Sequence, residues 1–323
     1  MRFLSADKIF PINDHPVING ILVLNNDNSI EDMLSPDDEN LPEAAQIEHH
    51  SGILCPGFVN AHCHLELSHM KGLVPEKTGL PQFIMQIVSR RNENADLKQE
   101  AIQKADEEMW SNGIEAVGDI CNTSDTLSTK LRSKIEYHSF VEVFSFDSSK
   151  AEEVLAVGKS VAQEYDLNGL KATVVPHAPY SVSESLFAGI RTQQKDYPGT
   201  ISIHNQETDS ENEMFVSGSG ELVEIFKKFG EDFSNFKPQF KSSLDYHLSQ
   251  LPANVNSVLV HNTMTKREEF ITANNHHSNL FWCTCAHANK YIESRIPNLP
   301  MWFETGANVC VGTDSLASNH QLS

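Results

Sequence analysis

The sequence has no apolar run long enough to cross a membrane, and residues 1–14 hold no apolar stretch of signal-peptide length. It also has little positive charge, with 24 Lys and Arg against 44 Asp and Glu and a formal net charge of -20. An exterior of this sign repels phosphate backbones and anionic lipid headgroups. We therefore expect a cytoplasmic protein that binds neither nucleic acid nor a membrane surface.

Cysteine is too sparse and too scattered for a disulfide framework. The six cysteines lie mostly in apolar, strand-like segments, which favours reduced and buried thiols. Cys283 and Cys285 are spaced closely enough to bind one metal ion together, but no second cysteine pair is present to complete a structural zinc site. The chain also shows no internal repeat and no low-complexity tract, so a hydrophobic core must hold the fold.

The 323 residues suffice for one large domain with a small companion, and 39% hydrophobic with 21% charged residues is typical of a globular protein. Residues 1–55 are strand-like and broken by turns, which predicts a small β module. Beyond Pro56 and Gly57, short apolar runs alternate with longer amphipathic segments to the end of the chain. We expect this second pattern to form one large domain over residues 56–323.

Strands and helices are expected to alternate through the large domain. The apolar runs predicted as strands are Ile53–Asn60, Ile114–Ile120, Tyr137–Phe144, Leu170–Pro176, Thr200–His204, Ser257–His261, Asn279–Cys283 and Asn308–Gly312. The helix-like stretches between them include Gln99–Trp110, Ala151–Tyr165, Glu184–Gln194, Glu211–Phe229 and Lys266–Ala273. Eight alternations in this length favour an α/β protein built as a (β/α)₈ barrel of the TIM type over an open, doubly wound sheet. The segment Asp232–Ser243 interrupts the alternation as a lid or a surface loop.

Ionisable side chains follow the predicted strands at the ends where a barrel carries its active site. His62 and His64 close the first strand, and their spacing of two residues points them to the same face. The later strands end in His177 after the fourth, His204 and Glu207 after the fifth, His261 after the sixth and Asp314 after the eighth. A lone buried histidine is more often structural, but this many ionisable groups in one barrel register favour a metal site. Three imidazoles and a carboxylate form a mixed N/O set suited to zinc or another borderline divalent ion, with a position open for water.

Three blocks of sequence carry most of these residues. They are Pro56-Gly57-Phe58-Val59-Asn60-Ala61-His62-Cys63-His64-Leu65-Glu66, His204-Asn205-Gln206-Glu207-Thr208 and Gly312-Thr313-Asp314-Ser315. Together they resemble the signature blocks of the amidohydrolase superfamily, in its deaminase and chlorohydrolase-like branch. The resemblance runs from about Leu22 to Leu322. It implies a barrel flanked by a small β-sandwich built from both termini, with one catalytic metal ion.

The resemblance also implies a role for each strand-end residue. The metal ligands would be His62, His64, His204 and Asp314, holding Zn²⁺ or, as the alternative, Fe²⁺. Glu207 would shuttle protons, and Asp314 would take the first proton from water. His261 would hold and polarise the attacked group or its water, and His177 would touch the substrate.

Two departures from the family pattern leave the substrate open. The family usually has His-Leu-Ala-Glu after strand five, whereas this sequence has His204-Asn205-Gln206-Glu207. The segment between the expected ligand and the expected proton shuttle is therefore more polar. The segment Cys283 to Asn289 lacks the usual Cys-Pro pair. No Lys stands at the end of the fourth strand, where binuclear members carry a bridging Lys, so we expect one metal ion.

These features predict hydrolytic deamination of an amino-substituted nitrogen heterocycle or an adenine-type nucleoside. Dechlorination or cyclic amide hydrolysis at the same site is the enzymatic alternative. The non-enzymatic alternative is a catalytically degenerate barrel that binds a ligand without converting it. The sequence leaves the exact substrate open, and it leaves open whether the chain forms a homo-oligomer.

The sequence ends nine residues after Asp314. No further helix follows to cover the predicted eighth strand, and no strands return to the small β module. We expect the natural protein to continue beyond Ser323 by some tens of residues, which an intact-mass measurement would check.

Overall fold

The computed structural model describes residues 1–196, 199–233 and 236–323. The chain folds into two compact units, Met1–Phe58 and Val59–Ser323. In the described part of the chain, no helix combines the length and the apolar character needed to cross a membrane.

The smaller unit is a five-stranded, mainly antiparallel sheet. Its strands are β1 (Arg2–Ile9), β2 (Val17–Ile18), β3 (Ile21–Leu24), β4 (Ile30–Leu34) and β5 (Ile47–Leu54), with the short helix η1 (Ala44–Gln46) before β5. The strand order is β2-β1-β3-β4, and β5 pairs with β1 in parallel. Ile21, Val23 and Leu24 on β3 are buried, so this strand forms the centre of a small apolar core.

Within the described residues, eight parallel strands form the centre of the larger unit. They are β6 (Phe58–Cys63), β7 (Ile114–Cys121), β8 (Glu136–Val143), β9 (Lys171–Pro176), β10 (Ile201–Asn205), β11 (Ser257–His261), β12 (Leu280–Thr284) and β13 (Val309–Val311). They form two sheets, in the orders β6-β7-β8-β9 and β10-β11-β12-β13. The His204 N–H donates to the His177 carbonyl at 3.0 Å, and Cys63 forms a parallel bridge with Asp314. These two contacts join both pairs of sheet edges, and the predicted α/β class with parallel strands is confirmed.

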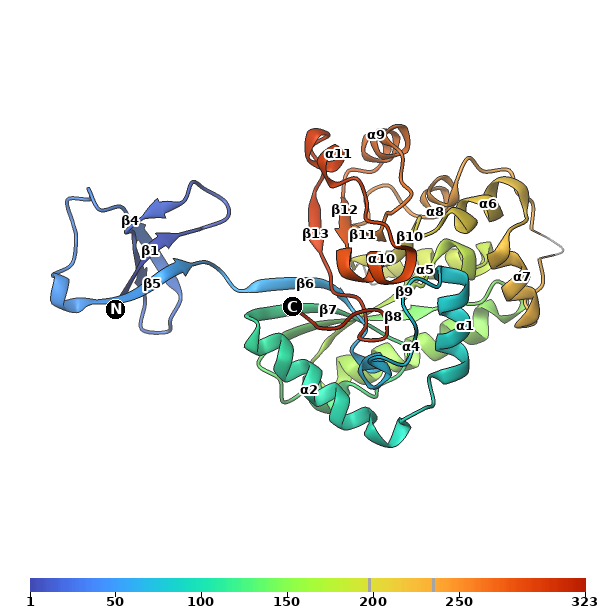
Figure 1. Ribbon diagram of the computed structural model, residues 1–323, viewed down its shortest axis with the longest axis horizontal. Coiled ribbons are helices and arrows are strands. Elements are labelled where there is room, and N and C mark those ends of the chain that lie inside the picture. The colour runs from blue at the N-terminus through green and yellow to red at the C-terminus, as the bar shows by residue number, and fades with distance from the viewer. Residues whose placement is uncertain (197–198, 234–235) are drawn as a thin grey trace. The chain divides into compact units, whose positions relative to one another are not determined.

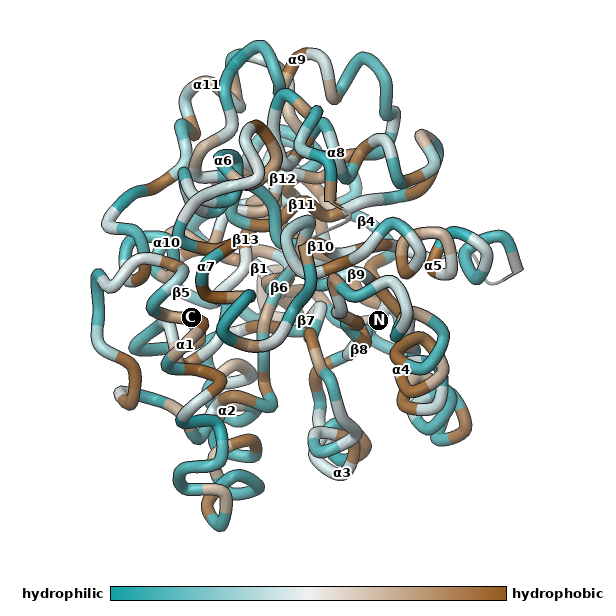
Figure 2. The backbone as a smooth tube through the Cα atoms, turned by 90° about the vertical axis from the view of Figure 1, so that its right-hand side faces the viewer, coloured by the Kyte–Doolittle hydropathy of each residue, from teal (hydrophilic) through white to brown (hydrophobic). Residues whose placement is uncertain are grey.

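Helices surround these strands, as Figures 1 and 2 show. They are η2 (Leu65–Met70), α1 (Leu80–Arg90), η3 (Ala95–Leu97), α2 (Lys98–Ser111), α3 (Leu127–Lys130), η4 (Ser148–Lys150), α4 (Ala151–Leu167), η5 (Pro179–Ser181), α5 (Glu184–Asp196), α6 (Asp209–Ser217), α7 (Glu221–Lys228), α8 (Ser243–Gln250), α9 (Arg267–His276), α10 (Ala286–Glu293) and α11 (Leu299–Glu304). Local sequence explains where some of them begin. The Asn298 side chain accepts the Met301 N–H at 3.2 Å and so caps the start of α11. Trp302 on that helix is fully buried against Trp282 of β12, which fixes the helix on the barrel.

Two predicted elements are divided in the structure. The helix predicted over Glu211–Phe229 is two helices, α6 and α7, because Gly218 and Gly220 between them have φ values of 70° and 112°. These backbone angles do not continue an α-helix and suit glycine. The strand predicted over Ile53–Asn60 is divided between β5 and β6, because Pro56 lacks the N–H that a strand ladder requires.

The predicted excursion Asp232–Ser243 contributes aromatic side chains to the core. The rings of Phe233 and Phe236 lie 4.6 and 5.3 Å from the ring of Phe146. Residues 234 and 235 of this segment lie outside the described residues. The described part is therefore anchored on the barrel through its phenylalanines.

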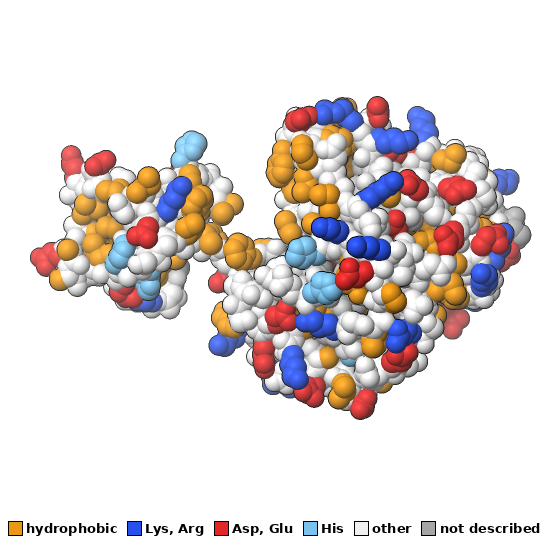
Figure 3. Space-filling model, viewed as in Figure 1, with side chains coloured by type: hydrophobic (Ala, Val, Ile, Leu, Met, Phe, Trp, Pro, Cys, Tyr) orange, Lys and Arg blue, Asp and Glu red, His pale blue; other side chains and the backbone are white. Residues whose placement is uncertain are grey.

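Part of the outer barrel surface is apolar. On the face drawn in Figure 3, hydrophobic side chains gather where Figure 1 places β13 and α11. Val311 on β13 is 60% exposed and Phe303 on α11 is 67% exposed. The outer face of the last strand is thus an open apolar surface.

A buried ion pair braces the first two barrel strands. The Lys130 Nζ lies 2.6 Å from Asp119 Oδ2, and both side chains are inaccessible to solvent. The ammonium also lies 4.7 Å from the centre of the Tyr165 ring. The other carboxylate oxygen of Asp119 accepts the backbone N–H of Leu65 at 2.8 Å. Because Leu65 directly follows His64, the pair holds the end of β6 in place.

We expect Lys130→Met to lower the free energy of unfolding by about 3–5 kcal/mol, the usual cost of leaving one partner of a buried ion pair alone. Urea denaturation followed by circular dichroism measures this change. Lys159→Met, at an exposed position on α4, is the matched control and should stay within about 0.5 kcal/mol of the wild type. Equal stability of the two variants would contradict the bracing role.

Candidate active site

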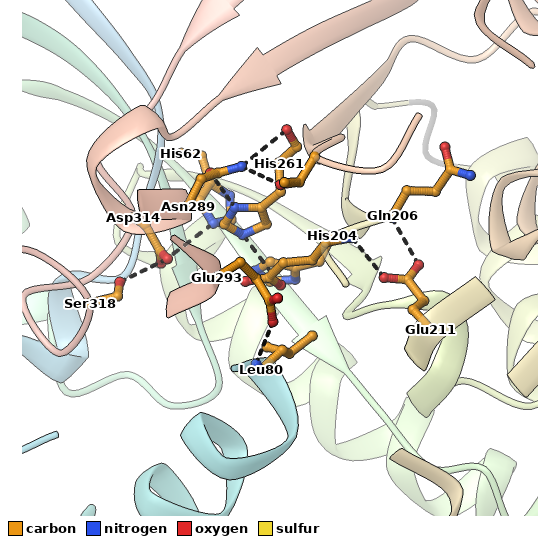
Figure 4. Close-up of polar contacts among 12 residues, drawn as sticks. His62, Leu80, His204, Gln206, Glu211, His261, Asn289, Glu293, Asp314 and Ser318 are labelled. Carbon is orange, nitrogen blue, oxygen red and sulfur yellow. Dashed lines mark hydrogen bonds and ion pairs between the residues drawn. The ribbon is translucent and has the colours of Figure 1, made fainter. Parts of the chain in front are cut away.

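Strained backbone marks the carboxyl ends of the barrel strands. Gln206, His261 and Asp314 have φ values of 45°, 74° and 60°, in the left-handed region that residues other than glycine seldom adopt. Such residues cost about 1–3 kcal/mol each and persist where their surroundings hold them. The Glu211 carboxylate provides part of that support, because it accepts the N–H groups of Gln206 and Glu207 at 2.9 Å each (Figure 4). Burial raises the pKa of Glu211 to about 7.

The predicted metal ligands converge at these strand ends. The ligand nitrogens of His62, His64 and His204 all lie within 4.8 Å of one another. The Nε2 atoms of His64 and His204 are 3.3 Å apart. Asp314 Oδ1 lies 3.6 Å from His64 Nε2 and 3.9 Å from His62 Nε2. His62 is fully buried, and neither of its ring nitrogens has a hydrogen-bond partner among the described residues.

The protonation states of these imidazoles suit a cation between them. His204 donates its Nδ1–H to the His177 carbonyl at 2.7 Å, so its Nε2 presents a lone pair to His64. Burial lowers the pKa of both His62 and His204, and the neighbouring imidazoles lower it further. Two nitrogens bound to one tetrahedral zinc ion are roughly 3.3 Å apart, given Zn–N distances of about 2.0–2.1 Å. The residues therefore fit a divalent cation of borderline softness.

Two serines orient the Asp314 carboxylate. Its Oδ1 accepts the Ser315 N–H at 2.7 Å. Its Oδ2 accepts the Ser318 hydroxyl at 2.9 Å, as Figure 4 shows. These hydrogen bonds hold Oδ1 toward the imidazoles. Asp314 can thus serve both as a ligand and as a proton acceptor beside the cluster.

Glu207 and His261 form a buried acid and base pair beside the imidazoles. Glu207 Oε2 lies 3.7 Å from His261 Nε2. The amide of Asn289 donates to Thr263, so its oxygen accepts the Nδ1–H of His261 at 3.0 Å and leaves Nε2 as an acceptor. Burial and the Asp314 carboxylate raise the pKa of Glu207 well above its ordinary value, and burial lowers the pKa of His261. The environment thus favours a protonated carboxyl next to a neutral imidazole.

One cavity of about 440 Å³ joins these groups. The strand ends supply much of its polar lining, namely His64, Asn122, Glu142, His177, His204, Glu207, His261 and Asp314. Arg91, Tyr180, Ser181, Glu231 and Ser315 also line it. Its apolar wall comes mainly from α1 and α7, with Phe83, Ile84, Ile87, Phe226 and Phe229. The volume is in the range of small-molecule sites. Of the predicted site residues, His62 alone is not part of the lining, because it lies behind His64 in the cluster.

Several residues of this cavity and its support were not predicted from the sequence. Glu142 lies between Val141 and Val143 on β8, so the signal was a carboxylate inside an apolar strand. Asn289, the partner of His261, lies in the segment that departs from the family pattern. The apolar wall of α1 was missed because the helix predicted between the first two strands, Gln99–Trp110, corresponds to α2, and no helix was predicted over Leu80–Arg90.

The fold and sequence have clear counterparts among known proteins. Residues 53–323 match the amidohydrolase family. An adenosine deaminase of Helicobacter pylori is 27% identical over 275 residues, which cover 84% of this chain and 66% of that protein. An aminodeoxyfutalosine deaminase of Nitratiruptor is 25% identical over 295 residues, which cover 87% of this chain and 68% of that protein. The chain thus spans about two thirds of the length of these relatives.

A solved structure agrees with this assignment at the level of the fold. The crystal structure of Helicobacter pylori aminofutalosine deaminase in complex with methylthio-coformycin matches with a TM-score of 0.88 at 23% identity, covering 100% of this chain and 79% of that one. The family match extends over most of the chain and includes every strand-end residue of the site. The chain therefore belongs to the amidohydrolase family.

Proposed function

We propose that the protein catalyses hydrolytic deamination of an amino-substituted nitrogen heterocycle, with an adenine-type nucleoside as the substrate class. The observation that carries the proposal is the buried carboxyl of Glu207 beside His261, in one cavity with the imidazole and carboxylate cluster. Replacing an amino group on such a ring requires a proton donor for the ring nitrogen and a nucleophile for the adjacent carbon. The relatives named adenosine deaminase and aminodeoxyfutalosine deaminase support this reaction class.

We infer that one divalent ion, zinc with iron(II) as the alternative, is held by His62, His64, His204 and Asp314. Three imidazoles and a carboxylate are donors that such ions accept. When bound, the ion supplies hydroxide at ordinary pH by lowering the pKa of water. A single ion is favoured because His204 has only one nitrogen free, the other being engaged by the His177 carbonyl.

The chain's own residues move the protons. Asp314 takes a proton from the attacking water as its oxygen adds to the ring carbon. Glu207, whose pKa is raised by burial, gives its proton to the neighbouring ring nitrogen. His261, fixed by Asn289, orients the attacking oxygen through Nε2. The proton on Asp314 then passes to the amino group, which leaves as ammonia, and Glu207 recovers a proton as the carbonyl forms.

Two finer features of the protein are also proposals. We propose that the sheet of residues 1–58 is part of a small β-sandwich, because Ile18, Ile30 and Ile53 leave apolar side chains that are more than half exposed. We propose the cytoplasm as the compartment, a choice supported by free thiols at all six cysteines.

We expect the protein purified without added metal to contain close to one equivalent of zinc or iron. His62→Ala combined with His64→Ala should remove it, because both substitutions delete donors from the cluster. Elemental analysis by mass spectrometry measures the content. The matched control is His15→Ala combined with His50→Ala, two exposed histidines of the smaller unit, which should retain the full equivalent. Unchanged metal content in the first double variant would rule out the assigned ligands.

We expect ammonia release from adenine-type nucleosides, and we expect Glu207→Gln to lower kcat by at least about a hundredfold while metal content stays the same. A glutamine fills the same space but cannot deliver the proton. An enzymatic ammonia assay over aminopurines, aminopyrimidines, their nucleosides and chlorinated analogues tests both points. Glu164→Gln, on the exposed face of α4, is the control and should match the wild type. Chloride release or ring opening without ammonia would argue against deamination, and an active Glu207→Gln would exclude Glu207 as the proton donor.

A further inference from the structure

A second polar cluster lines the cavity beside the candidate metal site. Glu142, near the end of β8, is 8% exposed. Its Oε1 accepts the side-chain N–H of Asn122 at 3.1 Å. Its Oε2 is buried and has no hydrogen-bond partner among the residues that the structure describes. Because an unpaired buried carboxylate oxygen carries its full desolvation cost, this atom is suited to a donor from a bound molecule.

This cluster does not provide a second full set of metal ligands. Ligand atoms of Glu142, His177 and His204 do lie within 4.8 Å of one another. His204, however, has only its Nε2 free, and that atom faces His64 at 3.3 Å. One lone pair binds one ion, so a second ion would have only two ligands from this cluster, fewer than zinc sites use. A neutral polar group of the substrate is the better partner for the free atoms of Glu142 and His177.

The place of the cluster in the cavity indicates which part of a substrate it meets. Glu207 and His261 follow β10 and β11, whereas Glu142 and His177 belong to β8 and the end of β9. All four line the same cavity. For a heterocycle with its reacting carbon at Glu207, Glu142 and His177 are therefore polar groups of the same cavity that are available to a substituent of the ring.

Building on the proposed deaminase function, we propose that Glu142 and His177 bind the two adjacent hydroxyls of a ribose, so that the substrate is a nucleoside rather than a free base. An ionised carboxylate only accepts hydrogen bonds, and a sugar hydroxyl donates one. The Nδ1 of His177 is engaged by Ser181 at 2.6 Å, which leaves Nε2 for the second hydroxyl. Hydroxyls on neighbouring carbons suit a carboxylate and an imidazole that each have an atom within 4.8 Å of the other.

Binding of two nucleosides to the full chain with its native metal tests this inference without requiring turnover. The probes are inosine, which carries both hydroxyls, and 2′,3′-dideoxyinosine, which lacks them. We expect the wild type to bind inosine at least about tenfold more tightly by calorimetry, the size of one hydrogen bond to a charged group. Glu142→Leu should remove most of this preference, by weakening the binding of inosine more than that of the dideoxy probe, whereas His177 keeps its one hydroxyl contact.

Two further variants keep the test interpretable. Glu142→Gln has the size of the native side chain and should fold where leucine does not, and its neutral amide should lose most of the preference. Glu136→Gln is the matched control at the exposed start of β8, where Glu136 pairs with Lys171, and it should keep the full preference. If both Glu142→Leu and Glu142→Gln bind inosine over the dideoxy probe as strongly as the wild type does, the proposal is overturned.

The remaining outcomes separate this inference from the proposed function. Equal binding of the two probes by the wild type, or no binding of either, overturns the diol site, whereas ammonia release from adenosine would still support deamination. A clear preference for inosine without ammonia release from any nucleoside supports the diol site and argues against deamination. If the wild type holds two metal equivalents and Glu142→Leu holds one, Glu142 binds a second ion and the proposed hydroxyl-binding role of Glu142 and His177 is overturned.

Discussion

Nitrogen lone pairs that converge without a cation repel one another, and the barrel is built so that those of His62, His64 and His204 converge. Contacts outside the cluster hold part of this geometry. His204 is fixed by the carbonyl of His177, and the end of β6 is fixed through the N–H that Asp119 accepts. These contacts orient the imidazoles in the arrangement that the proposed metal ion would require.

Burial acts in opposite directions on the two kinds of titratable group in this site. It lowers the pKa of imidazoles such as His62 and raises that of the Glu207 carboxyl, because in each case the charged form loses its hydration. The same dry environment therefore favours neutral imidazoles, which suit the proposed metal ligands, and a protonated carboxyl, which suits the proposed proton donor. Burial alone is thus the largest cause of the raised pKa of Glu207, which suits the proposed role as a proton donor.

Periodic and local signals explain which parts could be predicted. The strand Ser257–His261 coincides with its prediction, since a short apolar run with an ionisable end has few alternatives. The confluence of His62, His64, His204 and Asp314 was predictable because parallel strands bring their carboxyl ends to one place. The break between α6 and α7 was missed because the apolar periodicity on both sides of Gly218 and Gly220 was interpreted as one continuous helix. Asn289 and Glu142 were missed because their importance arises from partners far away in the sequence.

Strand ends supply polar side chains to the cavity, and helices supply most of its apolar side chains. Its polar floor consists of strand-end residues held by hydrogen bonds and strained backbone, a setting that tolerates little displacement. Its apolar wall comes from α1 and α7, which are joined by the hydrogen bond from Gln82 to Glu221 at 2.8 Å. The start of α1 is also held by Glu293, which accepts the Leu80 N–H at 2.6 Å (Figure 4). A change on these helices alters the shape of the wall without moving the proposed proton donor or the proposed metal ligands, so the two parts of the cavity can vary separately.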